Sequence, residues 1–232
     1  MAKPAWDVML RRTNTLFFTD DDYNVDSKKP EHRIQPGSVI GSGALSVFLH
    51  ELNDKVKSEN LKVNITLVGH SMGAIVINRI LSMEGITLPY KNIVHMASAD
   101  SIRNLFSTVV PYLNKNKETK FYSMSLHPEN EDREANFFGT VPSGSLLVWI
   151  DTMYTSPETV LDKRSGRWVN MERVLPKVPA DIRDRMFFKI FGLHSTAYEI
   201  ANKKCNVSKQ TQPLQHGDFN KLEYWREATW WK

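Results

Sequence analysis

Residues 61–81, LKVNITLVGHSMGAIVINRIL, form the stretch that decides the fold. Its first half, residues 63–68, is a short apolar run rich in β-branched side chains, which is typical of a buried strand. Apolar residues return at helical spacing over residues 75–81. Between the two lies the pentapeptide GHSMG at residues 69–73. The sequence therefore predicts a strand, a very tight turn and a helix in immediate succession.

The serine of this pentapeptide, Ser71, is the predicted nucleophile. Glycines at positions 69 and 73 leave room for the sharp turn, which lifts the Ser71 hydroxyl clear of the strand end. The N–H of Met72 and the N-terminus of the following helix then point toward any negative charge that forms beside that hydroxyl. Met72 is accordingly the predicted oxyanion donor.

Within its strand and helix, the elbow at residues 69–73 resembles the nucleophile elbow of the α/β-hydrolase superfamily of serine esterases and lipases. The resemblance extends from about residue 61 to the C-terminus and is specific at the elbow. It implies an α/β fold with a mostly parallel sheet, flanking helices, and a catalytic triad in the chain order serine, acid, histidine.

The same resemblance implies several strands before the nucleophile strand, and a loop among them that supplies a second oxyanion N–H. In this chain at most one strand is expected before Gly69, and no His-Gly pair occurs there. We therefore expect the N-terminal strands to be reduced or missing, and the second oxyanion donor is unassigned.

The composition is that of an ordinary globular protein. At 232 residues the chain is expected to form a single domain, residues 1–232, with a substantial core. Hydrophobic residues make up 41% and charged residues 24% of the chain, which are typical values. The net charge of +4 is small and no Lys/Arg cluster is interleaved with aromatics, so nucleic acid is not an expected partner.

Cysteine content and hydropathy indicate the cellular setting. Cys205 is the single cysteine, so no internal disulfide can form. The first twelve residues carry charges where the core of a signal peptide would lie. No apolar run approaches the roughly 18 residues of a membrane span. We therefore expect a cytoplasmic protein without a transmembrane segment.

Strands and helices are expected to alternate along the chain, as they do in the βαβ units of a parallel sheet. Beyond residues 61–81, the predicted elements are strands at 91–99 and 120–126, and helices at 42–58 (capped by Ser42), 101–114 and about 179–191. Residues 5–18 fit an amphipathic helix, although TLFFT at residues 15–19 could instead be a strand, and residues 19–41 fit a long polar loop.

A serine hydroxyl needs an adjacent base, and that base needs an orienting acid. The resemblance places the acid in a loop after the strand that follows the elbow by two units, which here is residues 128–134. Of the carboxylates in that loop, Glu131 and Asp132 stand at the expected offset, and the sequence does not choose between them. Asp100, at the end of the preceding strand, is the alternative, although a helix N-cap is its simpler role.

His216 is the predicted base, because it lies late in the chain, in a loop, with a glycine after it. This is the placement that the resemblance implies, and His194 is the alternative. Of the other histidines, His70 is expected to point away from Ser71, and His95 is expected to be a core residue.

The separation between Asp132 and His216 is much longer than one crossover and a loop. Residues 135–190 are therefore a candidate cap or lid insertion above the nucleophile. The aromatic residues that could line an apolar acyl pocket there, or pack in the core, are Phe137, Phe138, Trp149, Tyr154 and Trp168. In the C-terminal tail, Trp225, Trp230 and Trp231 fit the apolar seam of a final helix.

These residues together predict a serine hydrolase of carboxylic esters or thioesters, esterase- or lipase-like, that works through an acyl-enzyme on Ser71. The substrate would be a small-molecule or lipid ester. No metal or organic cofactor is required, and no Cys/His spacing fits a metal site. Two alternatives stay open: a non-catalytic interaction module on a hydrolase-like fold, and an acyltransferase. The sequence also leaves open a homo-oligomer or a partner protein.

Overall fold

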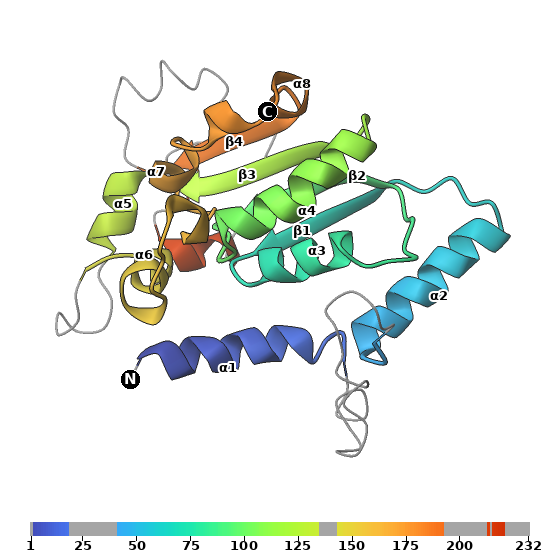
Figure 1. The fold of residues 1–232 in the computed structure, drawn as a ribbon, viewed down its shortest axis with the longest axis horizontal. Helices are drawn as coiled ribbons and strands as arrows, with labels where there is room; N and C mark the ends of the chain where they lie inside the picture. Colours follow the sequence, from blue (N-terminus) through green and yellow to red (C-terminus); the bar gives the residue numbers. More distant parts are fainter. Residues whose placement is uncertain (1, 19–40, 135–142, 193–212, 214, 221–232) are drawn as a thin grey trace.

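The structure is a computed structural model that describes residues 2–18, 41–134, 143–192, 213 and 215–220 (Figure 1). In chain order its elements are α1 (Ala2–Asn14), α2 (Ala44–Ser58), β1 (Ile65–His70), α3 (Gly73–Leu81), β2 (Tyr90–Met96), α4 (Ile102–Lys115), β3 (Lys120–Leu126), α5 (Pro128–Arg133), α6 (Leu146–Trp149), η3 (Ile150–Tyr154), η4 (Val160–Asp162), α7 (Trp168–Met171), η5 (Leu175–Lys177), α8 (Ala180–Arg183), β4 (Met186–Phe191) and η6 (His216–Asn220).

The four strands form one parallel sheet in the order β1-β2-β3-β4. Helices α3 and α4 lie side by side on one face of this sheet (Figure 1). The expected α/β fold with a parallel sheet and flanking helices is therefore confirmed. Because all strands are parallel, the segments that follow them meet at one edge of the sheet, and the described residues contain no strand before β1.

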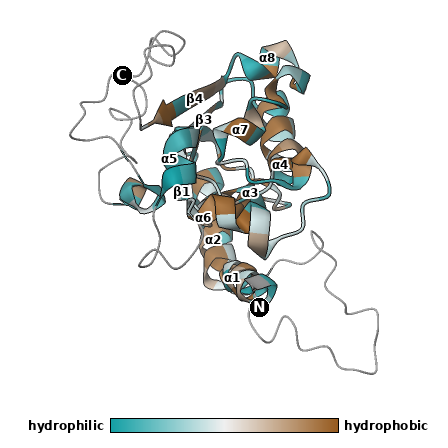
Figure 2. Ribbon diagram, turned by 90° about the vertical axis from the view of Figure 1, so that its left-hand side faces the viewer, coloured by the Kyte–Doolittle hydropathy of each residue, from teal (hydrophilic) through white to brown (hydrophobic). Residues whose placement is uncertain are grey.

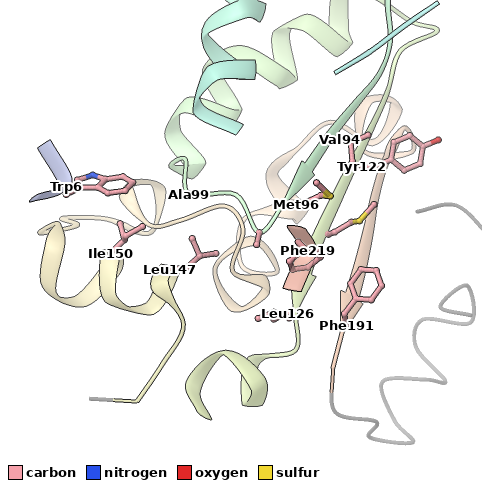
Figure 3. Close-up of a cluster of buried hydrophobic side chains, with 12 residues drawn as sticks. Trp6, Val94, Met96, Ala99, Tyr122, Leu126, Leu147, Ile150, Phe191 and Phe219 are labelled. Atoms are coloured by element: carbon pink, nitrogen blue, oxygen red, sulfur yellow. The ribbon is translucent and has the colours of Figure 1, made fainter. Parts of the chain in front are cut away.

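A hydrophobic core at the carboxyl ends of the strands joins segments that are far apart in the sequence (Figure 3). Trp6 of α1, Leu147 of α6 and Phe219 of η6 pack in it with Met96 at the end of β2. Leu147 and Phe219 are fully buried. This core anchors η6, and with it residue 216, next to the end of β1.

A second core lies between the sheet and helices α3 and α4. Its fully buried members come from helices and strands alike and include Ile93, Ile102, Val109, Leu113 and Phe121. The buried residues of α4 lie on one face of that helix, as the helical period of its sequence predicts. Helix α5, in contrast, is hydrophilic along its whole length (Figure 2).

The helix predicted at 179–191 is wrong in its second half. Residues 180–183 form the short helix α8, but Met186–Phe191 is strand β4, which pairs in parallel with β3. The segment MFFKIF is nearly all apolar, and an apolar run of this length fits a strand and a helix equally well by periodicity alone. Pairing with β3, a contact distant in sequence, decides the outcome.

The N-terminal part of the chain resolves one open alternative and corrects one cap. Residues 2–14 are helical, with Trp6 buried, so the predicted helix ends four residues earlier than expected. Residues 15–17 form a turn, so the described part of the alternative strand at 15–19 is not a strand, and residue 19 lies outside the described residues. Helix α2 begins at Ala44 and has Gly43, not Ser42, as its N-cap residue. A Cβ on Gly43 would lie 2.3 Å from the carbonyl carbon of Phe17, so the close approach of the two segments requires glycine there.

Part of the candidate cap at 135–190 belongs to the body of the fold, because β4 lies in the central sheet. The remaining described residues, 143–183, form short helical turns that pack on both cores. Trp149 stacks edge-on against Tyr154, and Trp168 lies 5.7 Å from the Phe188 ring. Phe137, Phe138 and the C-terminal tryptophans lie outside the described residues, and a lid function for this segment stays a prediction.

Within the described ranges, no helix combines the length and the apolar character that crossing a bilayer requires.

Candidate active site

Ser71 occupies the tight turn between β1 and α3. Its φ of 52° is in the left-handed region, which non-glycine residues adopt rarely. The turn is fixed to its surroundings because the Ser71 N–H donates to the Met96 carbonyl at 2.9 Å, and the Ser71 carbonyl accepts from the Ala99 N–H at 3.0 Å. The end of β2 and the segment that follows it therefore hold the strained serine backbone in place.

The two glycines of the pentapeptide have different roles. A Cβ on Gly69 would lie 2.5 Å from the carbonyl carbon of Gly73, whereas a Cβ on Gly73 would meet no atom within 4 Å. Only Gly69 is thus required by close packing of the turn on itself.

We expect Gly69→Ala to lower the free energy of unfolding by about 3 kcal/mol, because the added methyl group collides with main chain that cannot move aside. The matched variant Gly73→Ala should leave stability unchanged or raise it by up to about 1 kcal/mol, since it restricts the unfolded chain. Urea unfolding of the two variants checks this, and equal losses would contradict the assigned difference.

Ser71 and His216 lie together, although they are 145 residues apart in the sequence. The Ser71 Oγ lies 3.0 Å from Nε2 of His216. His216 begins the short helix η6, whose Phe219 packs in the core with the Phe191 ring 5.8 Å away. Packing of Phe219 in the core thus fixes η6 so that the His216 imidazole lies within hydrogen-bond distance of the Ser71 hydroxyl.

The main chain of His216 is held at both of its polar groups. Its N–H donates to Oε2 of Glu134 at 2.9 Å, and its carbonyl lies 3.0 Å from Nε2 of His70. The rings of His70 and His216 lie 4.9 Å apart. His70 therefore does not simply pack near the turn, away from the site, as the sequence suggests; it contacts the segment that carries the predicted base.

The second ring nitrogen of His216, Nδ1, is buried and has no hydrogen-bond partner among the described residues. The two predicted acids, Glu131 and Asp132, both contact Arg167: Glu131 Oε2 lies 3.1 Å from Nε, and Asp132 Oδ1 lies 3.4 Å from Nη2. Neither forms a hydrogen bond with His216 in the structure. Their assignment as the orienting acid stays a prediction.

These carboxylates lie on α5, a helix where the sequence predicts a loop. The stretch PENEDR has no apolar period, yet Glu131 is 1% exposed. Its partner Arg167 follows 36 residues later and also reaches Asp151, with Nη1 and Oδ2 3.4 Å apart. Asp151 in turn accepts from the Arg164 N–H and from Nδ2 of Asn170, both at 2.9 Å. We call Glu131, Asp151, Arg164 and Arg167 the buried ion cluster.

Burial raises the pKa of Glu131 to about 8, against the opposing effect of Arg167. Burial likewise raises the pKa of Glu134 above its usual value, while its bond from the His216 N–H lowers it and the charge of Asp218 raises it further. Burial lowers the pKa of His216 to about 3, and the nearby His70 lowers it too. His216 is therefore a neutral imidazole at neutral pH, as a general base must be.

The other titratable candidates have different partners, are buried in the core or lie outside the described part. The Asp100 carboxylate accepts from the Asn78 and Asn104 side chains at 2.6 and 2.8 Å. It does not cap α4, because Ser101 is the N-cap and its side chain accepts from the Asn104 N–H. His95 is fully buried in the core, as expected. His194 lies outside the described residues.

Met72 is the N-cap residue of α3, and its N–H donates to no described acceptor. It is thus free to donate to an oxyanion beside Ser71, whereas no second donor is assigned. The described residues hold no group of three His, Cys, Asp or Glu side chains that could bind a metal ion.

Two contacts of this site escape sequence reasoning. His70 and Glu134 act on the main chain of a residue that follows them by 146 and 82 positions, respectively. No local pattern marks such a pair, although Glu134 lies in the stretch of carboxylates that the sequence singles out. Comparisons with protein-family models, with curated proteins and with solved structures found no match for this chain.

Proposed function

We propose that this chain is a serine hydrolase of carboxylic esters or thioesters with the fold of the α/β-hydrolase superfamily. One observation carries the proposal. A serine in the left-handed region, at a turn from strand to helix, has its Oγ 3.0 Å from Nε2 of a buried neutral histidine. That geometry is what activation of a hydroxyl by an adjacent base requires.

The chemistry follows from these atoms. Nε2 of His216 accepts the Oγ proton as Ser71 attacks the carbonyl carbon of the ester, and the Met72 N–H stabilises the negative charge on the carbonyl oxygen. The imidazolium then gives its proton to the departing alcohol or thiol. Water attacks the acyl-enzyme in the second half, with His216 again accepting and returning a proton. No step needs a metal.

A non-catalytic interaction module on the same fold is the second candidate. Its support is that Met72 is the one oxyanion donor assigned within the described ranges, whereas acyl transfer usually uses two. This candidate is distinguished by turnover, which it does not show.

Pre-steady-state hydrolysis of a nitrophenyl ester tests the proposal. An acyl-enzyme on Ser71 predicts a burst of nitrophenol approaching one equivalent per chain, followed by slower turnover. Ser71→Ala should show neither phase. Absence of both burst and turnover for the wild-type chain, across short- and medium-chain esters, would favour the interaction module.

The low pKa of His216 predicts an unusual pH profile. An imidazole with the ordinary pKa of 6.5 is only about one quarter neutral at pH 6, which would reduce kcat/KM by about fourfold. Because burial lowers the pKa of His216 to about 3, we expect kcat/KM at pH 6 to be close to its value at pH 8. Ester hydrolysis followed by a pH-independent readout measures this. A fall with a midpoint near 6.5 would show that burial does not lower the pKa of His216 in the working protein.

A further inference from the structure

We propose that His70 and Glu134 are positioning residues that clamp the main chain of His216 and so set the orientation of its ring. The proposal rests on the proposed function of Ser71 and His216. Neither residue touches the hydroxyl that reacts, so each acts on the reaction through His216. The His70 side chain also forms a hydrogen bond with the Asn220 side chain, in the same short helix as His216.

The clamp holds both main-chain polar groups of His216. Glu134 Oε2 accepts from the His216 N–H at 2.9 Å, and Nε2 of His70 lies 3.0 Å from the His216 carbonyl oxygen. A carbonyl oxygen only accepts hydrogen bonds, so Nε2 of His70 carries the proton. His70 directly precedes Ser71, so the segment that carries the nucleophile also holds the base. The distance between the two reacting groups is thus fixed by adjacent residues.

The clamp matters because the ring of His216 has little else to orient it. Its Nδ1 has no hydrogen-bond partner among the described residues. In a serine–histidine–acid triad, a carboxylate on this nitrogen holds the ring in place. Here the restraint comes from the main chain and from the ring of His70, 4.9 Å away. A displacement of about 1 Å between reacting atoms can reduce the rate by about 100-fold, so this restraint has a large effect on turnover.

Glu134 is itself held by a rigid support. Its carbonyl accepts from the Gly144 N–H at 2.9 Å, and the Glu131 carbonyl, one turn earlier, accepts from the Ser145 N–H at 2.6 Å. Glu131 is fixed in turn by Arg167 in the buried ion cluster. The clamp therefore connects the predicted base, through α5, to the buried ion cluster.

The charges around the clamp fit its role. Burial lowers the pKa of His70, so at neutral pH its ring is neutral and adds no positive charge beside His216; only at low pH does a charged His70 oppose protonation of His216. The Glu134 carboxyl faces the His216 N–H on η6 and the charge of Asp218 on the same short helix. A neutral amide in place of either side chain can therefore retain the hydrogen bond.

The test compares removal with replacement of each hydrogen bond. His70→Leu and Glu134→Ala remove the donor and the acceptor, whereas His70→Gln and Glu134→Gln place an amide N–H and an amide oxygen at similar positions. We expect kcat to fall by about 10- to 100-fold in the first pair with KM changed less than about twofold. The glutamine variants should recover most of the loss. Glu129→Gln, an exposed carboxylate of the same helix, is the matched control and should keep wild-type kcat.

Hydrogen exchange of the peptide that contains residues 215–220 separates failure of the clamp from failure of the proposed function. The clamp predicts faster exchange of the His216 amide, by about tenfold, in His70→Leu and Glu134→Ala but not in the glutamine variants. That result without wild-type turnover would retain the clamp and reject the hydrolase. A wild-type enzyme whose kcat and exchange do not respond to either removal, or respond equally to removal and replacement, would overturn the clamp.

Discussion

Replacement of Ser71 by alanine is expected to reduce kcat/KM for ester hydrolysis by about 10⁴- to 10⁶-fold, the largest effect of any single change. The hydroxyl 3.0 Å from His216 forms the acyl bond, and no other group of the site can substitute for it. The rest of the site stays intact, because the main-chain bonds of residue 71 to β2 and to residue 99 do not involve the side chain. The melting temperature should therefore change by less than about 3 °C.

Ser107→Ala provides the matched control for this prediction. Ser107 is an exposed serine of α4 whose hydroxyl donates to the Asn104 carbonyl, and its loss should leave kcat/KM at the wild-type value. Retention of more than about one tenth of wild-type activity in Ser71→Ala would mean that another residue forms the acyl bond.

Replacement of Arg167 by leucine is expected to cause the largest loss of stability, about 3–5 kcal/mol. The Arg167 side chain is 12% exposed and reaches Glu131, Asp132 and Asp151. Without it, Glu131 loses the cation that it contacts, while Asp151 keeps Arg164 and Asn170. A buried carboxylate without a positive partner must remain charged at a high cost or take up a proton.

Chemical denaturation of Arg167→Leu at pH 9, above the pKa of about 8 that Glu131 has in the fold, measures this loss, because the carboxyl is ionised there. The double variant Arg167→Leu/Glu131→Gln should recover part of the stability, because the uncompensated charge is then absent. Lys117→Met is the control, since the exposed pair that Lys117 forms with Asp181 at 3.4 Å contributes at most about 1 kcal/mol. Equal losses in the Lys117 and Arg167 variants would show that the buried ion cluster does not stabilise the fold in this way.

The local parts of this fold can be predicted from the sequence. The strand–turn–helix around Ser71, strand β3 at its observed bounds and helix α4 all follow from apolar spacing and from cap residues adjacent in the chain. The approach of His216 to Ser71 also agrees with the order of residues that the resemblance implies. In each case the deciding signal lies within a single segment or in chain order.

The features that the sequence does not predict depend on residues far apart in the chain. Strand β4 pairs with β3 across more than fifty residues, and its apolar run alone does not distinguish strand from helix. Glu131 is buried because it pairs with Arg167, and nothing in the polar sequence of α5 indicates this contact. His70 likewise contacts a residue from the end of the chain. Contacts of this kind are set by tertiary packing, which composition and periodicity do not record.

The central claim, that Ser71 is a nucleophile activated by His216, is tested most directly by labelling with a fluorophosphonate and mapping the adduct by peptide mass spectrometry. We expect one adduct per chain, located on the peptide that contains Ser71, no adduct in Ser71→Ala, and labelling slowed by at least about 100-fold in His216→Ala. An unlabelled wild-type protein, or an adduct that persists in Ser71→Ala, would contradict the account.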